Sequence, residues 1–236
     1  MKIATIVGTR PNFIKAAALI TEIKKHDVGH VLIHTGQHYD KEMSRLFFDE
    51  LGIPKPDINL GVGSGSYGEQ IGNIIIKLEK ILVKEQPDLV IVVGDVNSTF
   101  AGALTAKQLG IKVAHVEAGL RSFDMSMPEE INRILTDRIS DFLFTTEKSG
   151  NENLSKEEIG KDKIFFVGNV MIDTLLKHKE KSKQSKILET LNIKKHGYCV
   201  LTLHRPSNVD GKKDFENILS ILERIQKDIK IIFPIH

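Results

Sequence analysis

Four apolar segments of this sequence end in charged or polar residues that could bind an anion and move protons. They run into Gly8-Thr9-Arg10-Pro11, with Lys15 about one helical turn further on, into Gly94-Asp95, into His115-Val116-Glu117, and into Leu203-His204-Arg205. Arginine and lysine side chains bind phosphate oxygens. Carboxylates and imidazole rings act as general acids and bases. The set therefore suits an anionic ligand combined with proton transfer.

These residues can act together only if the fold brings the ends of the apolar segments to one place. The sequence predicts a parallel sheet, which does so. Strands are expected at 3–7, 30–34, 89–94, 112–117, 141–145, 164–167, 198–203 and 230–234. These runs are rich in Val and Ile and do not alternate with polar residues, which is typical of parallel strands covered on both faces. Helix-period segments between them predict an α/β fold with a doubly wound, Rossmann-like sheet. Ligands bind such sheets beyond the carboxyl ends of the strands.

Two of the intervening helices are visible in the apolar pattern. One is expected to bury a face made of Ile71, Ile74, Ile75, Leu78, Ile81 and Leu82. For the other, Ser126 with Glu129 three residues later, beside Pro128, predicts a capped helix start. Its buried face is expected to consist of Ile131, Ile134, Leu135 and Ile139. Gly110 after Leu109 suits the C-terminal cap of a third helix.

A domain boundary is expected between residues 168 and 172. Residues 1–170 would form an N-terminal Rossmann-like domain, and 171–236 a linker helix with the first part of a second one. The lysine-rich stretch 177–186 predicts a solvated helix face. Only two strands follow, and two strands leave both edges and much apolar surface uncovered. We therefore expect a second domain that is incomplete, a chain truncated at its C-terminal end, and no activity from this chain alone.

Composition excludes several classes of function. The net charge is +2 with both signs interspersed, which argues against a nucleic-acid partner. No apolar run approaches the roughly 20 residues that cross a bilayer. Cys199 is the only cysteine and is expected to be buried in a strand, so a cytoplasmic location is expected. The glycine-rich stretch 61–68 is interpreted as a loop, and we expect neither a metal nor a cofactor.

The candidate residues also have structural interpretations. Asp95 could cap the helix that follows it, as is common for a residue after a strand-to-helix turn. Glu129 lies in a first helical turn, where the helix dipole favours a carboxylate whatever its function. Arg10 could pair with a surface carboxylate and Lys15 could line a helix face. Glu117 has no comparable explanation, because a glutamate at the end of an apolar strand suits a core poorly.

Taken together, the motifs resemble the non-hydrolysing UDP-N-acetylglucosamine 2-epimerases. The resemblance extends over the whole chain, in the family's order and spacing. It rests on Gly8-Thr9-Arg10-Pro11 with Lys15, Thr35-Gly36-Gln37-His38, Gly94-Asp95, His115 to Arg121, Pro128-Glu129-Glu130-Ile131-Asn132-Arg133 and Gly168-Asn169. It implies a glycosyltransferase B-like architecture of two Rossmann-like domains, and interconversion of UDP-N-acetylglucosamine and UDP-N-acetylmannosamine. A homodimer is also expected.

The same resemblance implies roles for individual residues. The catalytic set would be Asp95, Glu117, Glu129 and His204, and the substrate-binding set Arg10, Lys15, Arg133 and Arg205. UDP would leave C1 while a base removes the C2 proton, and 2-acetamidoglucal would then take UDP back with protonation on the other face. No metal or nicotinamide is implied.

Two departures from the family and three alternatives qualify this interpretation. Leu203-His204-Arg205-Pro206 replaces the Gly-His-Arg-Arg-Glu-Ser of many bacterial members, so the sequence does not decide whether a second, allosteric substrate molecule binds, while the histidine itself is kept. The family's later Asp-Ser-Gly-Gly segment is absent. The alternatives are a hydrolysing 2-epimerase that releases N-acetylmannosamine and UDP, a glycosyltransferase B-type transferase, and a non-catalytic nucleotide-sugar binder. The sequence does not assign either face of C2 to a particular carboxylate.

Overall fold

The computed structural model describes residues 1–37, 52, 55–203 and 206–234 of the 236. Residue contacts divide the chain into two compact units, Met1–His178 and Lys179–His236. The division falls inside helix α7 (Val170–Ser182). The first turns of α7 pack on the first unit, since the Thr174 hydroxyl donates to the Ile14 carbonyl at 3.0 Å. The domain boundary expected after residue 170 coincides with the first residue of α7 and stays a prediction.

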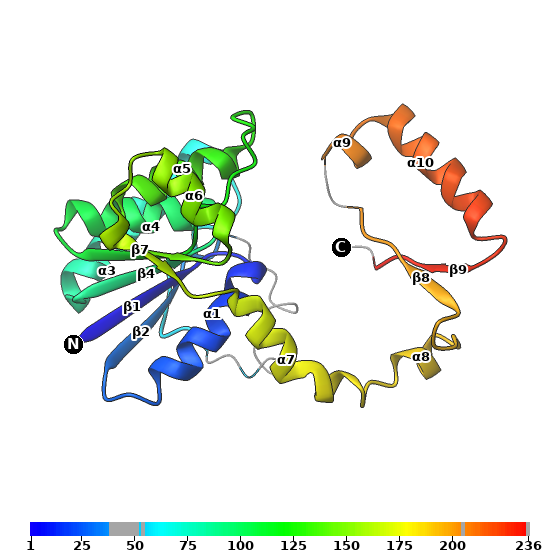
Figure 1. Ribbon diagram of the computed structural model, residues 1–236, viewed down its shortest axis with the longest axis horizontal. Coiled ribbons are helices and arrows are strands. Elements are labelled where there is room, and N and C mark those ends of the chain that lie inside the picture. The colour runs from blue at the N-terminus through cyan, green and yellow to red at the C-terminus, as the bar shows by residue number, and fades with distance from the viewer. Residues whose placement is uncertain (38–51, 53–54, 204–205, 235–236) are drawn as a thin grey trace. The chain divides into compact units, whose positions relative to one another are not determined.

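The first unit is a seven-stranded parallel sheet with helices on both faces (Figure 1). The strands lie in the order β3-β2-β1-β4-β5-β6-β7. Their bounds are β1 Lys2–Val7, β2 Gly29–His34, β3 Ile58–Asn59, β4 Leu89–Val93, β5 Lys112–Ala118, β6 Phe142–Thr145 and β7 Ile164–Phe166. The connections contain α1 Arg10–Ile23, α3 Tyr67–Glu85, α4 Asn97–Gln108, α5 Pro128–Ile139, α6 Lys148–Lys156 and the 3-10 turn η1 Lys161–Lys163. This is the doubly wound α/β sheet that the sequence predicts.

Side-chain alternation along the strands builds a core on each face of the sheet. Ala4 and Ile6 of β1 pack with the buried residues of α3 and α4. Val7, which points the other way, packs with Phe13 and Ile20 of α1. Because neighbouring residues in a strand face opposite sides, a strand covered on both sides must be apolar throughout. This explains why the central strands lack polar alternation.

The order of the strands also determines where a ligand can bind. β1 lies between β2 and β4, so the sheet is wound in one direction from β1 toward β3 and in the other from β4 onward. A crevice opens at such a switch point, beyond the carboxyl ends of the two strands. Here those ends lead into Gly8-Thr9-Arg10 and Gly94-Asp95. The polar residues singled out in the sequence therefore come together at one edge.

All eight predicted strands are present, with ends shifted by up to three residues. The two-residue strand β3 was not predicted, because it is too short to show a pattern. The apolar face expected for α3 is confirmed, with Ile74, Leu78 and Leu82 buried and Ile71, Ile75 and Ile81 packed against the same core. Among the described residues, no helix combines the length and the apolar character that a membrane span requires.

The face expected to be buried on α5 is only partly confirmed, since Ile139 packs against the core and Ile134 is half-buried, and the expected cap is wrong. Met127 is the N-cap, without a side-chain bond to the helix, and the Ser126 hydroxyl donates to Asp124 instead. The buried residues are polar, namely Glu130, Asn132, Thr136 and Asp137, whereas Ile131 and Leu135 are each 41% exposed. The polar face lies inward because its side chains bond to backbone at the ends of β4 and β5.

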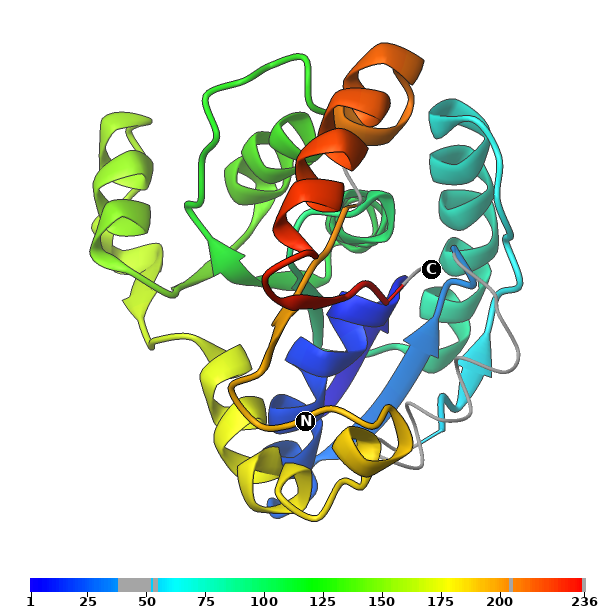
Figure 2. The ribbon, with the colours of Figure 1, turned by 90° about the vertical axis from the view of Figure 1, so that its right-hand side faces the viewer.

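The second unit holds a two-stranded parallel sheet of β8 (Tyr198–Val200) and β9 (Lys230–Ile232). The crossover between these strands runs through α9 (Pro206–Val209) and α10 (Lys212–Ile225), drawn in orange and red in Figure 2. The short helix α8 (Ile187–Thr190) precedes them. Cys199 is exposed, which contradicts its expected burial. In the part of this unit that the structure describes, two strands and one long helix cannot cover both faces of the sheet.

Candidate functional site

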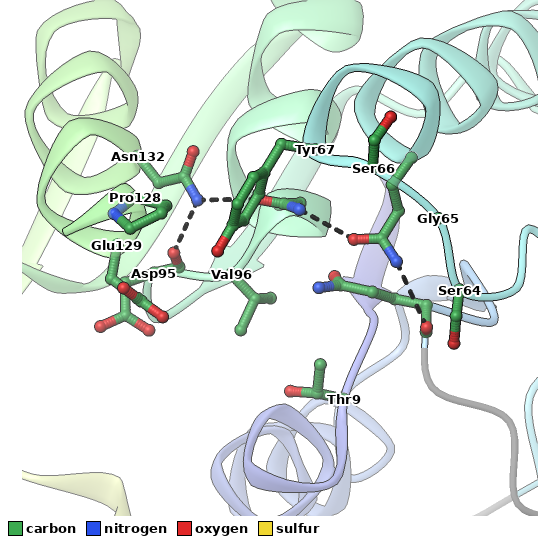
Figure 3. A pocket seen from close by; sticks show the side chains of 13 residues that line it. Thr9, Ser64, Gly65, Ser66, Tyr67, Asp95, Val96, Pro128, Glu129 and Asn132 are labelled. Carbon is green, nitrogen blue, oxygen red and sulfur yellow. Dashed lines mark hydrogen bonds between the residues drawn. The ribbon is translucent and has the colours of Figure 1, made fainter. Parts of the chain in front are cut away.

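A cleft of about 440 Å³ lies at the switch point between β1 and β4 (Figure 3). It is built from the turn before α1, the loop and first turn of α3, the turn between β4 and α4, and the first turns of α5. Its lining consists of Thr9, Gln37, Ser64, Gly65, Ser66, Tyr67, Gln70, Asp95, Val96, Asn97, Pro128, Glu129 and Asn132. Segments far apart in the sequence therefore meet here, as the parallel sheet requires.

A chain of side-chain amides ties the elements around the cleft together. Asn132 Nδ2 of α5 donates to the Asp95 carbonyl at 3.0 Å and to Asn97 Oδ1 at 3.1 Å. Asn97 Nδ2 in turn donates to Gln70 Oε1 of α3 at 2.8 Å. Gln70 Nε2 then reaches the Gly63 carbonyl at 3.1 Å. Because Asn97 and Gln70 each donate and accept within this chain of bonds, the wall has a defined shape and little freedom.

The sequence analysis assigned no role to Gln70, although its position in the sequence carries a signal. Gln70 lies four residues before Ile74, on the stripe of α3 that is otherwise apolar. A polar residue on a buried stripe must find a bonding partner, so this position marked a polar site. Residues 61–66 of the glycine-rich stretch form a loop, as predicted, with positive φ at Gly61 and Gly63, whereas Gly68 lies in the first turn of α3. Its continuation, Ser64–Tyr67, was not expected to line a site.

Asp95 lines the cleft and is paired with Arg133 of α5. It does not cap α4, since the N-cap is Val96 and no side chain bonds to the start of that helix. The second guanidinium nitrogen of Arg133 donates to Glu130 at 2.8 Å. Burial alone would lower the pKa of Arg133, but the two carboxylates outweigh it and the pKa is raised. Arg133 therefore stays charged and holds Asp95 toward α5.

Glu117 sits in an unusual backbone conformation beside Lys15. It is only 7% exposed, and its φ is +70°, in the left-handed region that costs a side-chain-bearing residue roughly 1–2 kcal/mol. The pairing of β5 with β6 is irregular at this point, and the Lys15 ammonium donates to its carboxylate. A Cβ on Gly94 would lie 3.1 Å from Lys15 Nζ. The pair therefore abuts the backbone just before Asp95, and such strain is typical of functional sites.

The remaining candidates are placed as follows. Glu129 lines the cleft from the first turn of α5. Arg10 is the first residue of α1 and is exposed. His204 and Arg205 lie outside the described residues. Within the described ranges, no group of three His, Cys, Asp or Glu side chains is arranged to hold a metal ion.

A buried network of charges lies behind these strand ends. His115 of β5 and Asp137 of α5 are fully buried, and His115 Nδ1 lies 2.6 Å from Asp137 Oδ1. The other oxygen of Asp137 accepts from the Gly119 N–H at 3.0 Å and from Arg121 at 2.8 Å. Arg121 also donates to both carboxylate oxygens of Glu157, each at 2.7 Å. Burial would raise the pKa of Asp137, but the charges of His115 and Arg121 prevail and lower it.

Comparisons with known proteins bear directly on this site. A family described as UDP-N-acetylglucosamine 2-epimerase matches residues 21–236. A "UDP-N-acetylglucosamine 2-epimerase homolog" of Methanococcus maripaludis is 55% identical over the whole chain, which spans 66% of that relative. A UDP-2,3-diacetamido-2,3-dideoxy-D-glucuronate 2-epimerase of Pseudomonas aeruginosa is 42% identical over the whole chain and 67% of its own length.

A solved structure agrees with these sequence matches. The UDP-GlcNAc 2-epimerase of Methanocaldococcus jannaschii, in complex with UDP-GlcNAc and UDP, superposes with a TM-score of 0.91 at 46% identity. The match covers all of this chain and 66% of that one. It confirms the α/β, glycosyltransferase B-like fold that the sequence predicts. The profile match, the sequence identity and the shared fold together show that the chain belongs to the UDP-N-acetylglucosamine 2-epimerase family.

Proposed function

We propose that the intact protein interconverts UDP-N-acetylglucosamine and UDP-N-acetylmannosamine without hydrolysis. The observation that carries the proposal is that one cleft is lined by two carboxylates from different elements, Asp95 after β4 and Glu129 on α5. A third, Glu117, is held beside it by Lys15. Inverting a carbon requires an acid–base group on each of its faces, and separate elements can supply them. The jannaschii relative, which binds UDP-GlcNAc and UDP, supports the same substrate.

The chemistry proposed follows from the substrate. The C2 hydrogen of the sugar is not acidic, because C2 bears an amide nitrogen and has no neighbouring carbonyl. Removal of that proton is feasible when UDP leaves C1 in the same process, which gives 2-acetamidoglucal. Return of UDP to C1 and of a proton to the opposite face of C2 completes the reaction. Cations near the leaving diphosphate stabilise its charge, a role proposed for Arg10, Lys15, His204 and Arg205.

An isotope experiment tests this function. The intact protein is incubated with UDP-N-acetylglucosamine in heavy water and followed by NMR. We expect deuterium at C2 in both UDP-sugars and no accumulation of free UDP. Free N-acetylmannosamine with UDP would indicate the hydrolysing reaction instead, and no exchange at all would point to a transferase or a binder. Because one relative acts on a diacetamido glucuronate, the corresponding UDP-uronate is tested in parallel as a competing substrate.

A second experiment tests how the diphosphate is bound. Arg10→Ala removes a guanidinium at the start of α1, where helix N–H groups also favour an anion. Loss of a charge-assisted bond of about 1.5–3 kcal/mol should weaken UDP binding by about 10–150-fold. Isothermal titration of UDP into the intact variant measures this. The control is Lys24→Ala, which removes an exposed cation just beyond the other end of α1. Equal affinities in the two variants would assign Arg10 a structural role.

The homodimer and the cytoplasmic location expected from the sequence stay predictions. So do the individual roles of the site residues.

A further inference from the structure

His115 is fully buried, and both of its ring nitrogens are engaged. Nε2 lies 2.8 Å from the carbonyl oxygen of Gly94, and Nδ1 lies 2.6 Å from Asp137. A carbonyl oxygen only accepts hydrogen bonds, so Nε2 donates; an ionised carboxylate also only accepts, so Nδ1 donates as well. Asp137 bridges His115 and Arg121, and Arg121 also pairs with Glu157.

The bond from Nε2 fixes the backbone immediately before a cleft carboxylate. Gly94 follows β4 and lies in the left-handed region, with φ +72°, and its N–H donates to the Val116 carbonyl of β5 at 3.0 Å. His115 thus holds the carbonyl of a residue whose N–H is already held by the same strand. Asp95 is the next residue, so the angle at which its side chain enters the cleft depends on the peptide that His115 anchors.

The other side of the network anchors the turn that follows Glu117. Asp137 accepts from the Gly119 N–H at 3.0 Å, and Gly119 has a φ of +79°. A Cβ at Gly119 would lie 2.4 Å from the Gly150 carbonyl oxygen, so this turn has little room to shift. One hydrogen-bonded pair, His115 with Asp137, therefore connects the turn that carries Asp95 with the turn that follows Glu117.

We propose that His115 is a positioning residue, which orients Asp95 for catalysis by holding the Gly94 carbonyl with its Nε2–H. The proposal rests on the proposed function, because it assigns His115 an effect on that reaction. It differs from a purely structural role, in which the buried pair with Asp137 would matter and the bond to Gly94 would not. Two substitutions separate these roles, since each preserves one of the two bonds.

The decisive comparison is between His115→Gln and His115→Asn in the intact protein. The glutamine amide nitrogen can take the place of Nε2 and keep the bond to Gly94, while the asparagine nitrogen can take the place of Nδ1 and keep the bond to Asp137. A misplacement of about 1 Å can cost about 100-fold in rate. We therefore expect His115→Asn to lower kcat by about 100-fold with KM nearly unchanged. His115→Gln should lower kcat by only about 10-fold.

Thermal unfolding of the same variants supplies the counter-test. Neither amide is charged, but only the glutamine variant also loses the buried hydrogen bond to Asp137, so it should be the less stable of the two although it is the more active. If activity follows stability instead, with His115→Gln both less stable and less active, the positioning role is wrong. Ser140→Ala is the matched control, because it removes a buried bond of 2.7 Å at the end of α5 and should leave kcat unchanged.

Two further measurements keep the proposal testable if a variant fails to fold or the wild type shows no turnover. In the wild-type protein labelled with ¹⁵N-histidine, the Nε2 of His115 should carry a proton at pH 7; an unprotonated Nε2 would overturn the proposal. Hydrogen exchange of peptides that span residues 93–98 should be faster in His115→Asn than in His115→Gln, whether or not the protein turns over UDP-N-acetylglucosamine. If the wild type is inactive but the two variants show this difference in exchange, the result would refute the proposed function and leave the positioning role standing. Equal exchange in the two variants would refute the positioning role.

Discussion

Replacement of Asp95 by asparagine should lower kcat for epimerisation by about 10²–10⁴, the scale of a lost general acid or base. KM should change little. The substitution keeps the shape of the side chain, and Arg133 keeps its 2.8 Å bond to Glu130, so the fold around the cleft has no reason to collapse. The change therefore removes mainly the capacity of the side chain to take or give a proton at the sugar. Steady-state kinetics on the intact protein measure both constants.

Glu117→Gln should also lower kcat by about 10²–10⁴ and change KM little. Its carboxylate is nearly buried and is paired with Lys15, so the amide loses both proton transfer and the attraction that orients the lysine. Glu152→Gln, an exposed change on α6, serves as the control and should retain wild-type turnover. Near-normal kcat in both Asp95→Asn and Glu117→Gln would rule out the catalytic assignment of these two carboxylates.

Removal of the Asp137 carboxylate should have the largest effect on stability. In Asp137→Ala, His115 and Arg121 lose the buried anion between them, and the Gly119 N–H loses its acceptor. Breaking a buried pair from one side leaves an uncompensated charge and costs about 3–5 kcal/mol. Denaturant titration at pH 7 measures this cost as a fall in the free energy of unfolding. The exposed Asp173→Ala on α7 is the control and should change it by less than about 0.5 kcal/mol.

The stabilities of the wild type and of Asp137→Ala should also respond differently to acid. The pKa of Asp137 is lowered in the folded state, because His115 and Arg121 outweigh the effect of burial. Its stabilising contribution is therefore complete above the ordinary aspartate pKa of 3.8 and is lost as the pH falls through the lower, folded value. The stability gap between wild type and Asp137→Ala should hold from pH 7 to about 5 and narrow below about 4. A gap independent of pH down to 3 would contradict the assignment of the lowered pKa.

Local sequence pattern alone determined much of this fold. The strands are apolar throughout because both faces of the sheet are covered, and the stripe of α3 repeats at the helical period because one face packs on the sheet. Each pattern depends only on neighbours in the chain, so the sequence displays it directly. The edge at which Arg10, Asp95 and Glu117 gather follows from these patterns too, since parallel strands place their carboxyl ends together.

The tertiary structure alone decided which side chains meet. Lys15 and Glu117 are 102 positions apart and Asp95 and Arg133 are 38 apart, so no local pattern records either pair. The polar face of α5 is turned inward, against its apolar periodicity, because Asn132 and Asp137 satisfy backbone groups at the ends of β4 and β5. That burial is favourable only because those bonds form. Their formation depends on the register of strands far away in the sequence, and only the folded chain sets it.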